Sequence, residues 1–147
     1  MFRNIRFSCL IILSCTFILF SCNASKHNKS GVQSAMTQYD HYIQKMDIDS
    51  LAMLFTPDGD LGNVAHGRDS IRKFLSKFKN FKVLSQSSTT ESINVNRDLS
   101  VQKGIYHQTT IIPVNDTVTV KGEYTATWEW LSKVGWRLKR MVTKPIK

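Results

Sequence analysis

Cysteine is scarce in this 147-residue chain, and none follows position 22. Residues 23–147 can therefore form no disulfide, no cysteine-ligated zinc site and no thiol nucleophile. Neither His66 nor His107 has another His, Asp or Glu at metal-ligand spacing, so we expect no metal site and no cofactor. The sequence also lacks internal repeats and low-complexity tracts, which leaves one domain of ordinary size.

Acidic residues are in the minority, because 20 Lys and Arg stand against 11 Asp and Glu, giving a net charge of +9. A basic surface can indicate nucleic-acid binding. Here the basic residues are scattered, except at 137–140 and at Lys73, Lys77 and Lys79. We therefore expect no nucleic-acid partner. The positive charge would either attract the domain to anionic lipid headgroups or serve no specific partner.

The chain has no apolar run that spans a membrane comfortably, and its most apolar segment is Cys9–Phe20. Arg3 and Arg6 precede this segment, in the order typical of a signal peptide. We expect residues 1–21 to be removed as a signal peptide. The loss of two arginines would then lower the net charge from +9 to +7.

The apolar segment ends in Leu19-Phe20-Ser21-Cys22, which resembles a bacterial lipobox. The resemblance implies a lipoprotein in which Cys22 carries diacylglycerol and a further acyl chain such as palmitate. This lipid anchor would hold the protein to its partner, the membrane. Residues 22–31 would be the lipidated cysteine and a flexible linker. Asn23 is not the aspartate that retains some lipoproteins at the inner membrane, so the implied location is the bacterial cell envelope, at the outer membrane.

The most regular pattern in the chain covers Thr117–Leu131. Its even positions are apolar or aromatic and its odd positions are polar, which is the alternation of a strand with one buried face. Fifteen residues is long for a strand, so we expect it to bend around the core, with Gly122 at the bend.

Helical spacing precedes this strand, and period-two alternation surrounds it. Helices are predicted over 32–46, 48–55 and from 67 to 78, with an irregular or weakly stranded stretch at 60–66 after Pro57-Asp58-Gly59. Strands are predicted over 81–86, 89–96, 99–112, 117–131 and 136–144. This order indicates an α+β domain over residues 32–147, with helices packed on one face of a curved antiparallel sheet.

Two registers are open for the pairing of strand 99–112 with the central strand. One buries Lys103, and the other exposes both Leu99 and Val101. We predict a bulge at 102–104 that reconciles them. Beyond the bulge, Tyr106 should be buried beside Tyr124.

The same register leaves His107 outside and defines a candidate pocket. Its aromatic and amide side chains suit orientation and affinity for a small ligand rather than proton abstraction. The predicted pocket residues are Tyr39, Gln102, Tyr106, Gln108, Tyr124 and Trp128.

Three stretches, 46–60, 67–74 and 122–138, together resemble the nuclear transport factor 2-like superfamily, specifically its SnoaL-like bacterial members. The resemblance implies a cone-shaped fold, in which a strongly curved antiparallel sheet wraps around the N-terminal helices and leaves a pocket at its open end. Members often dimerise through the sheet, so a homodimer is also implied.

The ketosteroid isomerases of this superfamily pair a carboxylate base with a tyrosine, and the tyrosine matches Tyr39. The position of the base falls on Asn63, whose amide cannot accept the proton. Asp60 is a substitute, and Glu91 shares a strand face that would present it at the pocket rim.

Three hypotheses follow from these residues. The first is an envelope-anchored lipoprotein whose conical pocket binds a small, partly apolar ligand without catalysis. The second is an enzyme of the isomerase, dehydratase or cyclase type that uses Tyr39 with Asp60 or Glu91. The third is a dimerising protein-interaction module.

Overall fold

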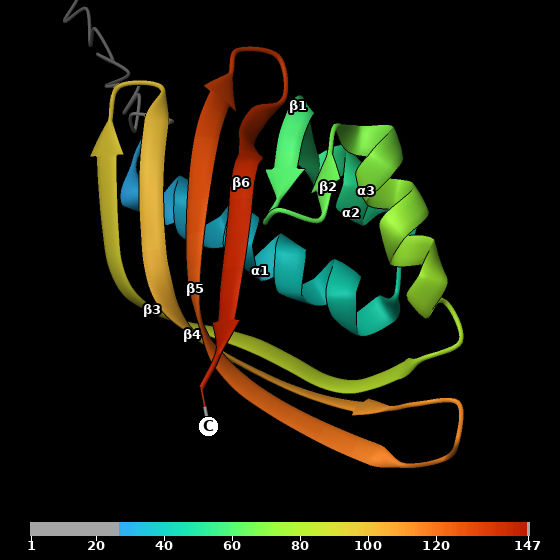
Figure 1. The fold of residues 1–147 in the computed structure, drawn as a ribbon. Coiled ribbons are helices and arrows are strands. Elements are labelled where there is room, and N and C mark those ends of the chain that lie inside the picture. The colour runs from blue at the N-terminus through green and yellow to red at the C-terminus, as the bar shows by residue number, and fades with distance from the viewer. Residues whose placement is uncertain (1–26, 147) are drawn as a thin grey trace, which may run out of the picture.

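The computed structural model describes residues 27–146, so Cys22 and the expected signal peptide lie outside the described residues. Within this range the chain forms N-terminal helices and one six-stranded sheet (Figure 1). The helices are α1 (Lys29–Lys45), α2 (Ile48–Leu54), α3 (Arg68–Leu75) and the 3-10 helix Ser76–Phe78. The strands are β1 (Phe55–Leu61), β2 (Ala65–His66), β3 (Lys82–Asn96), β4 (Leu99–Ile111), β5 (Thr117–Leu131) and β6 (Gly135–Pro145).

Helix α1 begins earlier than the sequence indicated. The Asn28 side chain caps it by accepting a hydrogen bond from the Gly31 amide at 2.8 Å, so the helix starts at Lys29 rather than at Val32. The polar segment expected to be a linker up to residue 31 therefore ends sooner, and its last residues belong to the folded domain.

The stretch after α2 is the strand β1, where the sequence predicted a stop at 57–59 followed by an irregular or weakly stranded stretch over 60–66. Strand β1 pairs in parallel with β6, so the sheet is not purely antiparallel. Its register shifts between Phe55 and Asp60, and Pro57 lies inside that gap, where it interrupts no regular ladder.

The two strands predicted at 81–86 and 89–96 are one continuous strand, β3. The intervening serines do not break it, because Ser88 points inward and donates a hydrogen bond to Asp40 of α1 at 2.7 Å. Gln86 bonds the same carboxylate oxygen at 3.0 Å. Polar side chains on this strand therefore form hydrogen bonds with helix α1, and the chain makes no turn at these serines.

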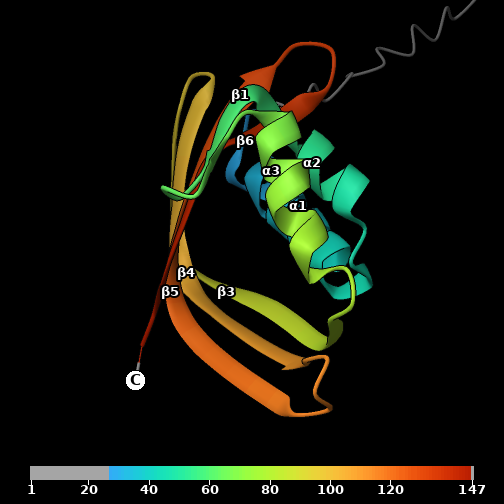
Figure 2. The same cartoon turned by 45° about the vertical axis from the view of Figure 1, so that its right-hand side comes forward.

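The strands lie in the order β2-β1-β6-β5-β4-β3, and the sheet is open. The long strands β3, β4 and β5 bend midway, so that their lower halves curl beneath the helices (Figures 1 and 2). The upper half packs its inward face on α1. The core formed there comprises Val32, Ala35, Met36, Leu54, Phe55, Ile71, Tyr124, Ala126, Trp128, Trp136, Leu138 and Met141.

The predicted bulge in β4 is wrong. Pairing of β4 with β5 runs without a break from Leu99 opposite Glu129 to Ile111 opposite Thr117. Leu99 and Val101 consequently face outward, with Leu99 53% exposed. The irregularity lies one strand away, in β3, where Glu91 is the extra residue between the Thr90 and Ser92 pairings.

Two tyrosines lie across two glycines at the bend of the sheet. Tyr124 pairs with Gly104, and Tyr106 pairs with Gly122. A Cβ on Gly104 would overlap the Thr89 carbonyl oxygen, and one on Gly122 would lie 2.5 Å from the Tyr106 ring. Neither position accepts a side chain, which explains why glycine stands at the bend predicted at Gly122.

Candidate ligand-binding pocket

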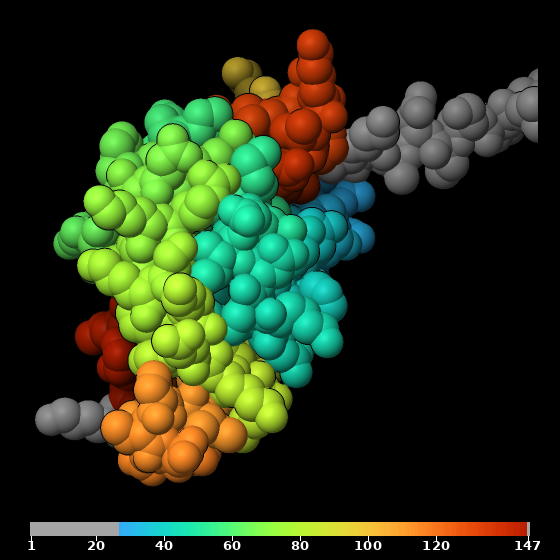
Figure 3. Space-filling model, turned by 90° about the vertical axis from the view of Figure 1, so that its right-hand side faces the viewer, coloured from blue at the N-terminus to red at the C-terminus, as the bar shows by residue number. Residues whose placement is uncertain are grey.

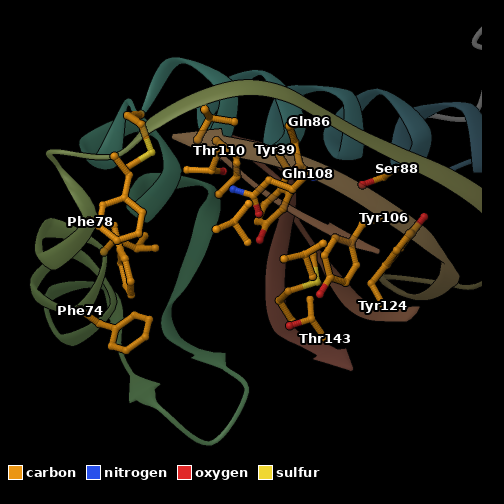
Figure 4. A pocket seen from close by; sticks show the side chains of 18 of the residues that line it. Tyr39, Phe74, Phe78, Gln86, Ser88, Tyr106, Gln108, Thr110, Tyr124 and Thr143 are labelled. Atoms are coloured by element: carbon orange, nitrogen blue, oxygen red, sulfur yellow. The ribbon is translucent and has the colours of Figure 1, made fainter. Parts of the chain in front are cut away.

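A cavity of about 440 Å³ lies between the curled half of the sheet, the C-terminal half of α1 and the α3 segment (Figure 4). This volume is within the range of small-molecule sites. The lining residues are Tyr39, Ile43, Met46, Phe74, Leu75, Phe78, Phe81, Val83, Gln86, Ser88, Tyr106, Gln108, Thr110, Ile112, Val118, Val120, Tyr124, Met141 and Thr143.

No charged side chain lines this cavity within the part of the chain that the structure describes. The nearest carboxylate in the hydrogen-bond network is Asp40, which lies behind Ser88 and Gln86. Because the Ser88 hydroxyl donates its hydrogen to Asp40, the Ser88 oxygen can act only as an acceptor toward any further group. The pocket therefore offers neutral polar groups on largely apolar walls.

Tyr39 supplies a neutral phenol at the wall formed by α1. Burial, and then the negative charge of Asp40 and the neighbouring Tyr106, raise the pKa of Tyr39 well above its ordinary value. The hydroxyl thus stays protonated at physiological pH. Neither Tyr39 nor Gln108 makes a side-chain hydrogen bond to another described residue, which leaves both available to a ligand.

Tyr106 and Tyr124 line the same cavity, as the sequence predicted for that face of the sheet. Tyr106 is half-buried and lies beside Thr143 of β6, and burial raises its pKa (Figure 4). The Tyr124 hydroxyl is 3.2 Å from Thr90 Oγ1, and its pKa is also raised by burial. His107 is exposed on the opposite face.

Gln102 and Trp128 do not line the cavity, contrary to the prediction. Both are fully buried in the upper half of the sheet, where Trp128 Nε1 donates to Gln102 Oε1 at 3.0 Å. Gln102 Nε2 in turn donates to Thr90 Oγ1 at 2.8 Å and to Gln33 Oε1 of α1 at 3.3 Å. These residues form a polar network inside the core.

The two carboxylates considered as bases do not reach the pocket either. Asp60 binds His66 Nδ1 at 2.7 Å and lies 3.7 Å from Arg140 on the β1 side of the sheet. Asn63 is exposed beside them and accepts a hydrogen bond from Arg140 at 3.2 Å. Glu91 is exposed at the β3 bulge. The structure therefore does not bring Tyr39 together with Asp60 or Glu91.

Sequence reasoning missed the α3 wall of the pocket. Phe74 and Phe78 stack edge to face with ring centroids 5.4 Å apart, and Figure 4 shows both on that side. Their helical spacing marked an apolar face, but spacing does not distinguish a face in the core from one that borders a cavity. Lys77 Nζ lies 5.6 Å from the Phe74 ring and brings a positive charge near this wall.

Across residues 27–146 the structure contains no cluster of three or more metal-ligating side chains. No helix in that range is both long and apolar enough to cross a membrane.

A bent sheet around an N-terminal helix, with a pocket at the curled end, defines the nuclear transport factor 2-like class of fold. The chain belongs to the SnoaL-like domain family, whose model matches residues 27–142. A comparison with curated proteins finds no match.

Solved structures with this fold are similar at low sequence identity. A ketosteroid isomerase-like protein from Erwinia carotovora atroseptica aligns with a TM-score of 0.71 and 14% identity, over 80% of this chain and 95% of that one. A nuclear transport factor 2-like superfamily protein from Salmonella enterica aligns with a TM-score of 0.67 and 15% identity, over 80% and 90%. A protein from Catenulispora acidiphila, in complex with S-DNPA, aligns with a TM-score of 0.68 and 14% identity, over 79% and 91%.

Proposed function

We propose that this protein is an envelope lipoprotein, anchored through Cys22, whose pocket binds a small, uncharged and largely apolar molecule without catalysis. The observation that carries the proposal is the lining of the cavity, which combines aromatic and aliphatic walls with neutral polar groups and has no charged residue. Such a lining stabilises an apolar ligand by burial and orients it with a few hydrogen bonds. A charged ligand would lose its hydration there without gaining a counter-charge.

The polar groups suggest how the ligand is oriented. Tyr39 offers a hydroxyl donor, Gln108 offers both a donor and an acceptor, and Ser88 offers an acceptor. A ligand carrying one hydroxyl, carbonyl or amine on an apolar skeleton satisfies this set. The structural neighbour from Catenulispora acidiphila, which was solved in complex with S-DNPA, supports ligand binding as a use of this fold.

A pair of fluorescent probes with one skeleton tests this function. We expect the uncharged N-phenyl-1-naphthylamine to bind and to brighten, whereas its sulfonated analogue 8-anilino-1-naphthalenesulfonate should bind more weakly. Tyr39→Phe should weaken binding of the uncharged probe by about fivefold, the size of one hydrogen bond of about 1 kcal/mol. Fluorescence titration measures both effects, and equal binding of the two probes would contradict an uncharged pocket.

Asp60→Asn and Glu91→Gln are the matched controls, and neither should change probe affinity because neither residue borders the cavity. The same variants test the alternative that the protein is an enzyme, which is motivated by the likeness to a ketosteroid isomerase-like protein. If a substrate is found and either change lowers kcat by about a hundredfold, the size typical of losing a general acid–base, the protein is an enzyme.

We also propose self-association through the outer face of the sheet. Leu99, Val101 and Val142 expose aliphatic side chains there, with exposed fractions of 53%, 39% and 38%. Sedimentation velocity should show a dimer at micromolar concentration. Val101→Glu should shift it to a monomer, whereas a monomeric parent protein would rule this interface out.

A further inference from the structure

The first described residue of the chain is fixed to two hairpins at one end of the domain. The His27 ring lies 4.5 Å from the Trp130 ring and 6.2 Å from the Trp136 ring, between centroids. Its Nδ1 atom is 3.2 Å from a carboxylate oxygen of Asp98 in the β3–β4 turn. The Asp98 carbonyl oxygen also accepts a hydrogen bond from the Trp130 amide at 2.7 Å, which ties the two hairpins together.

These contacts of His27 limit how far the domain can move from a lipid on Cys22. Five residue steps separate Cys22 from His27, and an extended chain advances at most about 3.6 Å per residue. The His27 end must then lie within roughly 18 Å of the modified cysteine. The 22–31 linker expected from the sequence would have allowed about twice that reach, and with it free tumbling.

The surface around His27 has the chemistry of a bilayer contact. Lys29, Arg97 and Lys133 are exposed there, while the carboxylate of Asp98 is engaged with His27. Val134 is 49% exposed at the tip of the β5–β6 hairpin. A shallow depression lies between His27 and residues 130–134. Basic side chains around exposed aliphatic ones match an anionic headgroup layer.

The pocket lies at the other end of the molecule. Ile112 and Val118, which flank the β4–β5 turn, both line it. Figures 1 and 3 place that turn opposite the β5–β6 hairpin, and strand β5 connects the two ends through fifteen residues.

From these positions we infer that the end of the domain formed by His27 and the β3–β4 and β5–β6 hairpins rests on an anionic bilayer, with the pocket held at the far side. The inference depends on the proposed lipidation of Cys22. It implies that the pocket receives its ligand from the aqueous space and not from the membrane to which the protein is anchored.

Two exposed turn valines provide a matched test, because residues 23–147 contain no cysteine. Val134→Cys labels the tethered end, and Val114→Cys, at a position 78% exposed in the β4–β5 turn, labels the pocket end. Each variant is purified as the full acylated chain, labelled with a fluorophore and placed in phosphatidylglycerol-containing vesicles whose headgroups carry a nitroxide quencher. We expect the label at 134 to lose most of its fluorescence and the label at 114 to lose little.

Equal quenching at the two positions, or stronger quenching at 114, would overturn the orientation. In vesicles of phosphatidylcholine alone, the difference between the positions should shrink, and an unchanged difference would overturn the role of anionic headgroups. Mass spectrometry of the same samples reports the acyl chains on Cys22. An unmodified chain would refute both the anchor and the orientation, whereas an acylated chain with equal quenching would refute the orientation alone.

Discussion

Replacing Trp128 with alanine is expected to lower the free energy of unfolding by about 3–5 kcal/mol, the cost typical of truncating a buried tryptophan. Trp128 is fully buried in the centre of the core. The substitution also removes the indole N–H that donates to Gln102 Oε1, so a buried acceptor loses its partner. Urea unfolding followed by far-UV circular dichroism measures the change.

Trp128→Phe separates the two contributions. It keeps most of the apolar volume but removes the donor, so we expect a loss of about 1–3 kcal/mol from the unpaired Gln102 oxygen. Thr127→Ala, on the outward face of the same strand, is the matched control and should have little effect. If Trp128→Ala unfolds at the same urea concentration as the parent protein, the network does not stabilise the core.

Trp128→Ala would also weaken ligand binding, but through the fold. The cavity lies in the other half of the cone, so a binding defect should appear only as the domain unfolds. Probe binding measured at a temperature where the variant is folded distinguishes this indirect effect from a direct contact.

The alternation of β5 predicted the fold well, because a two-residue period is a local property of the chain. It placed Tyr124 on the inner face, as observed. Tyr106 on the inner face and His107 on the outer one were also predicted correctly, but from a bulge in β4 that the structure does not have. The register of β4 was not predictable in the same way. The observed register looked costly because it exposes Leu99 and Val101. The contacts that favour it include those of Gln102 with Trp128 and Gln33, which are 26 and 69 residues away in the sequence.

The same limit explains the errors in the predicted site. Alternation identifies the inner face of a strand, but it does not say which half of a bent strand borders the cavity. Gln102 and Trp128 share that face, yet they lie on the half that packs against the start of α1 near Gln33. Tyr39 and Gln108 lie on the side of the cavity. The bend at Gly122 was predicted, but which side of it borders the cavity depends on packing against the helices, which a strand pattern does not encode.

Strand β3 shows a related effect. The sequence predicted a break at 87–88, where two serines, a residue common in turns, separate the two predicted strands. In the fold, Ser88 and Gln86 are satisfied by Asp40, which is 46–48 residues away, and the strand continues. The polar side of the pocket was therefore hidden in a segment that looked like a loop.

Filling the cavity should abolish binding while leaving the fold intact. Val120 is partly buried on the inner face of β5, on the curled side of Gly122, and it lines the pocket. Val120→Trp adds an indole to a space that a ligand would otherwise occupy. We expect affinity for N-phenyl-1-naphthylamine to fall by at least about a hundredfold, or about 2.7 kcal/mol. The cost to stability should be small, because the side chain enters a void rather than a packed core.

Thr119→Trp is the matched control, since Thr119 is the adjacent residue, exposed on the outer face of the same strand. It introduces the same indole without reaching the cavity, so probe affinity should be unchanged. Fluorescence titration and urea unfolding of both variants separate blockade from damage. If Val120→Trp binds the probe as tightly as the parent while Thr119→Trp does not, the binding site is on the outer face of the sheet. A loss in Val120→Trp alone, with unfolding free energy preserved, places the ligand inside the cone.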